Sequence, residues 1–184
     1  MTFKQCIGKL LLKITGWKIL GFKPKEENFI LVVFPHTSYY DFFVGKIFNL
    51  YIGFPIYYMI KKEAFIFPFG WLLKASGGVP IDRKKPSATM LQMIERFNDE
   101  NQFVLSIAPE GTREKVENWK PGFWYFASKA NVPVVPAGMN YKNKTVYFGK
   151  PIYMTEDRDA DIERVKNVFR NIDLCGKHPD QSQL

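Results

Sequence analysis

Cysteine is scarce in this chain, and several motifs that assign a function directly are missing. The two cysteines, Cys6 and Cys175, are far apart and show neither a C-x-x-C pair nor a metal-ligand spacing, so we interpret both as reduced thiols. The sequence has no G-x-S-x-G motif, which disfavours a serine hydrolase. It also has no P-loop, no zinc spacing and no RNP-like stretch, which disfavours the common nucleic-acid-binding modules.

We expect neither a signal peptide nor a membrane-spanning run in this sequence. Lys9 and Lys13 interrupt the only apolar stretch near the N-terminus, so no hydrophobic signal region forms. Residues 42–60 approach spanning length, but polar residues, glycine and proline interrupt them. We therefore expect a helix followed by a strand in this segment.

Positive charge and aromatic side chains are abundant. The 184 residues include 26 Lys and Arg against 18 Asp and Glu, a formal net charge of +8, and 16% are aromatic. The length suits one domain with a sizeable core. A basic balance favours an anionic partner, either nucleic acid or an acidic membrane surface. The aromatic content favours the membrane surface, and we expect no nucleic-acid partner.

Apolar runs of helical and strand character alternate along the chain, which predicts one α/β domain around a largely buried sheet. Helices are expected at 3–20, 38–51, 87–98 (with Ser87 as N-cap), 122–130 and 159–172. Strands are expected at 29–34, 56–60, 103–108, 132–137 and 145–148. Residues 61–83 are expected to be rich in loops. The predicted organisation is an N-terminal amphipathic helix (1–22), a catalytic domain (23–174) and a loose polar tail (175–184).

The N-terminal helix has two possible roles. Its apolar side chains repeat at helical spacing while Lys9 and Lys13 point elsewhere. A basic face beside an apolar face that includes Trp17 is typical of a helix lying in a bilayer interface. Packing against the core, with solvated lysines, is the alternative interpretation.

Two short polar islands follow strand-like runs. Residues 36–41 (HTSYYD) follow 29–34, and residues 109–113 (PEGTR) follow 103–108. Segments that leave the carboxyl ends of strands are where α/β proteins usually build their sites. We therefore take both islands as candidate parts of one site.

The first island offers a histidine and a carboxylate. If His36 lies before the helix and Asp41 in its first turn, the carboxylate fixes the imidazole tautomer and leaves the other ring nitrogen free as a base. The alternative is structural, because Ser38-x-x-Asp41 also matches a helix capping box. On that interpretation His36 is a surface loop residue.

The second island offers groups suited to a phosphate. Gly111 permits a tight turn, Arg113 presents a planar fork for an anion, and Thr112 adds a donor. Glu110 is expected to hold Arg113 or to bind substrate hydroxyls. An ordinary Glu–Arg surface turn is the alternative.

Two further segments contain cations of the same type. Residues 77–83 (GGVPIDR) end at Arg83 after a strand-like run and two glycines, which suits either a phosphate site or a simple loop with an Asp–Arg pair. Lys61 and Lys62 end a predicted strand and add positive potential. We include Lys61 among the substrate-binding candidates, although solvated lysines are the commoner case.

The order of these motifs resembles the four blocks of the glycerolipid acyltransferase family, which includes the 1-acylglycerol-3-phosphate acyltransferases. The matching segments are His36-x4-Asp41, residues 78–83 (GVPIDR), residues 109–113 (PEGTR) and residues 132–136 (VPVVP), with 61–65 (KKEAF) and 68–71 (PFGW) between the first two blocks. The resemblance covers about residues 29–140. It implies a mixed sheet flanked by helices, with a groove for an acyl chain.

The resemblance also implies roles for individual residues. His36 would deprotonate an acceptor hydroxyl and Asp41 would orient it, and the hydroxyl would attack the thioester of acyl-CoA or an acyl carrier protein. Residues of the second and third blocks would bind the phosphate and glycerol of the acceptor, which is a lysophosphatidic-acid-like or another lysolipid: Arg83, Glu110, Gly111, Thr112 and Arg113. No covalent enzyme intermediate, no metal and no cofactor beyond the acyl donor are expected.

Two alternatives remain open at this stage. A thioesterase would use the same His36–Asp41 pair to activate water, and a non-enzymatic basic module would bind a membrane or nucleic acid. For the acyltransferase, long acyl chains favour an enzyme that works at the bilayer, because burying each methylene is worth about 0.8 kcal/mol. We therefore expect a cytoplasmic protein peripheral to the inner face of a membrane.

Overall fold

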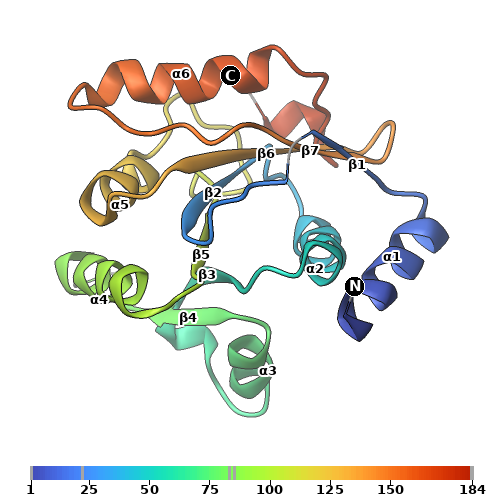
Figure 1. The fold of residues 1–184 in the computed structure, drawn as a ribbon, viewed down its shortest axis with the longest axis horizontal. Helices are drawn as coiled ribbons and strands as arrows, with labels where there is room; N and C mark the ends of the chain where they lie inside the picture. The colour runs from blue at the N-terminus through green and yellow to red at the C-terminus, as the bar shows by residue number, and fades with distance from the viewer. Residues whose placement is uncertain (1, 22, 83, 85, 183–184) are drawn as a thin grey trace.

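The computed structural model describes residues 2–21, 23–82, 84 and 86–182, which form an α/β unit built on one mixed sheet (Figure 1). Seven strands of the described chain follow the order β1-β7-β6-β2-β5-β3-β4. Their bounds are β1 (Lys18–Gly21), β2 (Phe29–Phe34), β3 (Ile56–Lys61), β4 (Gly78–Ile81), β5 (Val104–Ile107), β6 (Val134–Asn140) and β7 (Thr145–Phe148). The expected single α/β domain with a mixed sheet flanked by helices is confirmed.

The helices cover both faces of this sheet (Figure 1). They are α1 (Phe3–Thr15), α2 (Tyr40–Ile52), α3 (Phe69–Ala75), α4 (Pro86–Asp99), α5 (Gly122–Ala130) and α6 (Arg158–Arg170), with short 3₁₀ turns η1 (Lys62–Ala64) and η2 (Pro179–Gln181). Within the described residues, no helix combines the length and the apolar character needed to cross a bilayer.

Alternation along the central strand separates two apolar cores. In β2, Phe29 and Leu31 join the cluster formed with α1 and α2, whereas Ile30 and Val32 join the cluster formed with α4, α5 and α6. Successive side chains of a strand point to opposite faces, so a continuous apolar run marks a strand that is covered on both sides. This explains why the run FILVVF sits at the centre of the sheet.

Strand direction gathers the functional segments at one end of the sheet. β2 pairs in parallel with β5 and β6, and β3 pairs in parallel with β5 and β4. The carboxyl ends of these five strands therefore lie at the same end of the sheet, which is where ligand sites form in such folds. β7 runs antiparallel to β6 and β1 runs parallel to β7, so Trp17, just before β1, also lies at this end.

Several sequence-based expectations for the helices and strands are wrong. The first helix ends at Thr15 with Gly16 at φ +76°, and the segment expected to complete it is the edge strand β1. The stretch 61–83, expected to be rich in loops, contains α3 and β4. Ser87 lies inside α4, which already begins at Pro86, so it is not the N-cap.

The C-terminal tail is not loose over the residues that the structure describes. Cys175 forms a bridge with Asn140 at the end of β6: its N–H donates to Met139, and its carbonyl accepts from Tyr141. The η2 turn follows. The polar composition led to the expectation of a loose tail. That expectation was wrong because the contacts that order the tail are made with residues far away in the sequence, which composition does not reveal.

Candidate active site

The two polar islands meet at the carboxyl end of the sheet. The first leaves β2 and enters α2, and the second leaves the neighbouring strand β5. A hydrogen bond of 2.9 Å from the backbone N–H of His36 to Oε2 of Glu110 joins them directly. Residues 74 positions apart in the sequence are thus in contact, and they follow strands that are neighbours in the sheet.

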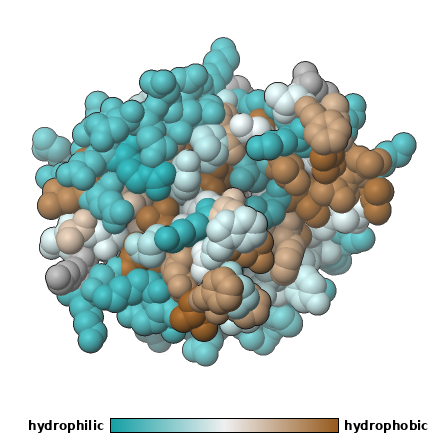
Figure 2. All heavy atoms as spheres, turned by 90° about the horizontal axis from the view of Figure 1, so that it is seen from below, coloured by the Kyte–Doolittle hydropathy of each residue, from teal (hydrophilic) through white to brown (hydrophobic). Residues whose placement is uncertain are grey.

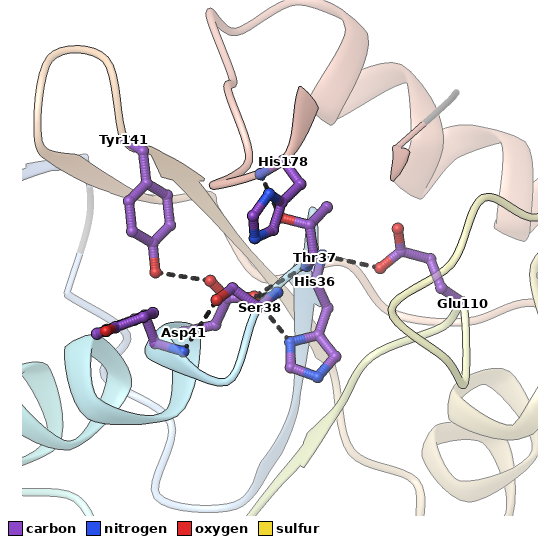
Figure 3. Close-up of polar contacts among 8 residues, drawn as sticks. His36, Thr37, Ser38, Asp41, Glu110, Tyr141 and His178 are labelled. Atoms are coloured by element: carbon purple, nitrogen blue, oxygen red, sulfur yellow. Dashed lines mark hydrogen bonds and ion pairs between the residues drawn. The ribbon is translucent and has the colours of Figure 1, made fainter. Parts of the chain in front are cut away.

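Within the first island, His36 and Asp41 form the expected pair. Nδ1 of His36 lies 3.0 Å from Oδ2 of Asp41, and the second ring nitrogen faces away from the carboxylate (Figure 3). The His36 side chain is 25% exposed, whereas that of Asp41 is 3% exposed. The imidazole therefore has one end fixed by a buried acid and keeps contact with the surface of the site.

Asp41 also serves the start of the helix, although the capping box expected as the alternative is only half formed, since Tyr39 is the N-cap of α2. Its Oδ2 accepts the backbone N–H groups of Thr37 (2.9 Å) and Ser38 (3.0 Å), while the Ser38 hydroxyl accepts from Tyr40 N–H (3.2 Å). One carboxylate oxygen thus serves both the backbone at the helix start and His36, so His36 is not the free surface residue of that alternative.

The electrostatics of this pair determine which group donates. Burial raises the pKa of Asp41, but hydrogen bonds from His36, Tyr141 and the Ser38 backbone outweigh it and hold the pKa below its ordinary value. Asp41 is therefore a carboxylate near neutral pH and accepts the Nδ1–H of His36. In the neutral imidazole this leaves Nε2 as an unprotonated acceptor.

Tyr141 is a site residue that the sequence analysis missed. Its hydroxyl donates to Oδ1 of Asp41 at 2.6 Å, from the turn after β6 (Figure 3). Strand β6 extends to Asn140, three residues beyond its expected end at Ala137. A correct strand end would have placed Tyr141 directly after a carboxyl end, like the other site residues.

Glu110 is a buried part of the site. It is 2% exposed, and it contacts the His36 backbone. Burial raises the pKa of Glu110 to about 7, the His36 N–H opposes that change, and the Asp41 charge adds to it. The sequence suggested two roles for Glu110. Among the described residues it makes no ion pair with Arg113. Its binding of substrate hydroxyls stays a prediction.

The rest of the second island forms a turn that presents cations. Gly111 has φ +67°, which favours glycine, and a β-carbon built there would lie 2.7 Å from Nζ of Lys120. The ammonium of Lys120, which the sequence analysis did not consider, therefore lies over this turn. Thr112 is half-buried, and its hydroxyl accepts from the N–H of Glu114 at 3.3 Å.

Arg113 packs against the first island. Its Cζ lies 3.6 Å from the centroid of the Tyr39 ring, and its Nε is buried without a hydrogen-bond partner. Within the described part of the chain, no carboxylate pairs with this guanidinium. A guanidinium stacked on an aromatic ring and lacking a carboxylate is well suited to an anionic ligand.

The remaining predicted residues are placed less fully. Lys61 is exposed at the carboxyl end of β3, where it pairs in register with Ile81 of β4. Its neighbour Lys62 forms an ion pair with Asp82 at 2.7 Å, so part of its positive potential is neutralised. Arg83 lies outside the described residues.

The C-terminal tail also reaches the first island. The backbone N–H of His178 donates to Oγ1 of Thr37 at 3.2 Å, and a β-carbon on Gly176 would lie 2.7 Å from the same atom. With its side-chain amide oriented to satisfy both groups, Gln181 donates to the carbonyl oxygens of Arg113 (3.0 Å) and Thr37 (3.2 Å). The tail thus supports the backbone of both islands from one side.

Comparison with known proteins identifies the family of this chain. The family model described as Acyltransferase matches residues 21–140, so the chain belongs to the acyltransferase family. Among curated proteins, the chain is similar to the 1-acyl-sn-glycerol-3-phosphate acyltransferase of Streptococcus pneumoniae, with 27% identity over 164 residues. That match covers 80% of this chain and 59% of the relative, so the chain spans about three-fifths of the relative's length.

A solved structure has the same fold. The 1-acyl-sn-glycerophosphate (LPA) acyltransferase PlsC from Thermotoga maritima superposes with a TM-score of 0.61 and 22% identity. The alignment covers 91% of this chain and 77% of that structure. At this identity the likeness establishes the architecture alone.

Proposed function

We propose that this protein is an O-acyltransferase that moves a fatty acyl group from a thioester donor to a hydroxyl of a lysophosphatidic-acid-like lysolipid. The observation that carries the proposal is the His36–Asp41 pair, joined at 3.0 Å with its second ring nitrogen turned away from the acid. The Streptococcus relative and the Thermotoga neighbour are both named as acyltransferases of a glycerolipid that carries a phosphate. These names support the choice of acceptor. The donor is acyl-CoA or an acyl carrier protein.

The reaction assigned to this pair is a direct transfer. Nε2 of His36 takes the proton of the acceptor hydroxyl as its oxygen bonds to the thioester carbonyl carbon. The carbon–sulfur bond then breaks, and the thiolate takes that proton from the imidazolium, which leaves an ester and a free thiol. Asp41 remains ionised throughout and stabilises the imidazolium, in the manner of the acid in a catalytic triad.

Binding of the acceptor's phosphate is assigned to cations at the same end of the sheet. Arg113 lacks a carboxylate partner among the described residues, and Lys61 is exposed at the end of β3. Arg83, which the family pattern adds to this set, keeps that role as a proposal. A phosphate held by these groups would bring the neighbouring hydroxyl towards His36.

We also assign the protein to a membrane surface. Two apolar groups are exposed on the face that Figure 2 shows, one over α1 and one over α3. The α1 stripe, defined here as Phe3, Ile7, Leu10 and Ile14, has helical spacing on one side of α1; the α3 patch consists of Ile66, Phe67, Phe69, Trp71 and Leu72. Large exposed apolar groups on a chain with net charge +8 favour an anionic lipid surface.

The test is an acyl-transfer assay on the purified protein. Acyl-CoA and acyl-carrier-protein donors are supplied in separate arms with a panel of lysolipids, and the products are resolved by mass spectrometry.

His36→Ala is expected to lower turnover by about 10²-fold or more with folding intact, because it removes the base. Arg113→Ala is expected mainly to raise the apparent KM of the phosphate-bearing acceptor.

Each rival predicts a different product. Free fatty acid and free thiol without acyl-acceptor product would indicate a thioesterase. No turnover of any donor, with salt-sensitive retention of DNA or RNA, would indicate the nucleic-acid-binding module. Near-wild-type turnover in His36→Ala would remove the proposed mechanism.

A further inference from the structure

The two oxygens of the Asp41 carboxylate have different partners. Oδ2 accepts from His36 and from the backbone N–H groups of Thr37 and Ser38. Oδ1 accepts from Tyr141, whose hydroxyl lies 2.6 Å away. Asp41 is 4% exposed, so solvent does not readily replace a lost partner.

We propose that Tyr141 is a positioning residue for the reaction, acting through Asp41 and resting on the function proposed above. The Tyr141 hydroxyl anchors Oδ1, which prevents rotation of the carboxylate and keeps Oδ2 directed at Nδ1 of His36. It also stabilises the ionised acid that the neutral His36 tautomer requires. Tyr141 touches neither reacting atom, so its contribution is geometric and electrostatic.

The state of Tyr141 suits this role. Burial, the hydrogen bond to Asp41 and the Asp41 charge all raise the pKa of Tyr141. The phenol is therefore always a donor over the pH range in which an enzyme of this type works. A hydroxyl that never ionises holds the carboxylate with the same polarity throughout the reaction.

The rest of the fold fixes Tyr141 from two sides. Its ring meets Trp17 edge-to-face, with centroids 5.1 Å apart, and its backbone N–H donates to the Cys175 carbonyl at 2.8 Å. Trp17 precedes β1 and Cys175 begins the C-terminal tail. Both terminal segments thus contact Tyr141, one at its ring and one at its backbone, and Tyr141 in turn contacts the acid of the pair.

The decisive variant is Tyr141→Phe, which removes the hydroxyl and keeps the ring that packs on Trp17. We expect kcat to fall by about tenfold, as for other residues that orient a primary catalytic group, with the KM of donor and acceptor nearly unchanged. Tyr153→Phe, at an exposed tyrosine, is the matched control and is expected to retain wild-type kcat.

A second readout is independent of activity. Carboxyl ¹³C NMR titration, with the Asp41 resonance assigned by Asp41→Asn, follows the pKa of Asp41 in wild type and in Tyr141→Phe. The pKa of Asp41 should rise in Tyr141→Phe, because a hydrogen bond to the charged form is lost. If the Tyr141 side chain only filled space, the pKa of Asp41 would be the same in Tyr141→Phe and in the wild type.

The two proposals fail in different ways. An unmoved Asp41 titration in Tyr141→Phe overturns the positioning role whatever reaction the protein performs, as does an unchanged kcat in that variant. Absence of acyl transfer by the wild type overturns the proposed function instead, and with it the catalytic meaning of the contact.

Discussion

At the scale of single residues, the site combines one ionised acid with a second acid that resists ionisation. Asp41 is surrounded by donors, whereas Glu110 accepts a backbone hydrogen bond from His36 and lies near the Asp41 charge. Their pKa values are therefore displaced in opposite directions. Two buried carboxyl groups in one site thus respond differently to pH because their hydrogen-bond partners differ.

Glu110 should make the stability of the protein dependent on pH. Its pKa is about 7 in the folded state against an ordinary value of 4.5, so the folded state binds the extra proton between these limits. Stability then falls as pH rises from about 4.5 to about 7, by at most about 3 kcal/mol. Glu110→Gln removes that cost and keeps an acceptor for the His36 N–H.

Urea unfolding at pH 5 and pH 8 tests this expectation. Glu110→Gln should be more stable than wild type at pH 8, with a smaller difference at pH 5. Glu117→Gln, at an exposed position, provides the control and should follow the wild type at both pH values. Equal pH dependence in Glu110→Gln and wild type would contradict the raised pKa of Glu110.

At the scale of elements, α1 has two different faces. Gly8 lies against α2 so closely that a β-carbon would be 2.4 Å from the backbone nitrogen of Tyr51, and Leu12 is buried beside it. The α1 stripe lies on the opposite side and is exposed. The two roles considered from the sequence, packing and interfacial docking, thus belong to separate faces of the same helix.

Charges placed in the α1 stripe should weaken membrane association. Leu10→Glu with Ile14→Glu should reduce partitioning onto anionic vesicles by at least about tenfold, since burying each aliphatic side chain is worth about 1.5–3 kcal/mol. Leu91→Glu is the matched control, because Leu91 is a 61% exposed leucine on α4 at the other face of the sheet. Vesicle flotation measures the change, and equal loss in both variants would refute a role specific to α1.

At the scale of the whole molecule, the sheet brings separate cations to one end. The carboxyl ends of β2, β3, β4, β5 and β6 coincide, so Lys61 and Arg113 approach the same region although they are 52 positions apart. Six helices of the described chain cover the faces of the sheet. The net charge of +8 adds a long-range attraction for anionic surfaces.

Binding to anionic vesicles should therefore depend on salt. Raising NaCl from about 0.1 M to about 1 M shortens the Debye length from about 10 Å to about 3 Å, which screens the net charge. We expect the fraction bound in sedimentation to fall over this range for anionic vesicles and to change little for zwitterionic ones. Salt-independent binding to both would assign membrane association to the apolar groups alone.

The sequence predicted much of the fold and the centre of the site. The run FILVVF on β2 and the alternation of helices and strands follow from local periodicity, and the positions of His36 and Asp41 follow from the strand that precedes them. Strand β1 was mistaken for the end of a helix, because its residues continue the amphipathic pattern and only pairing with β7 makes them a strand.

What the sequence by itself determined is local: which segments are apolar on one side, where they end, and that an imidazole and a carboxylate five residues apart can meet at a helix start. The tertiary structure alone decided which distant groups complete the site, namely Tyr141 on Asp41, Glu110 on the His36 backbone and the tail on Thr37. The physical reason is that such contacts depend on strand order and register. These are set by packing across the whole sheet and leave no periodic trace near the residues concerned.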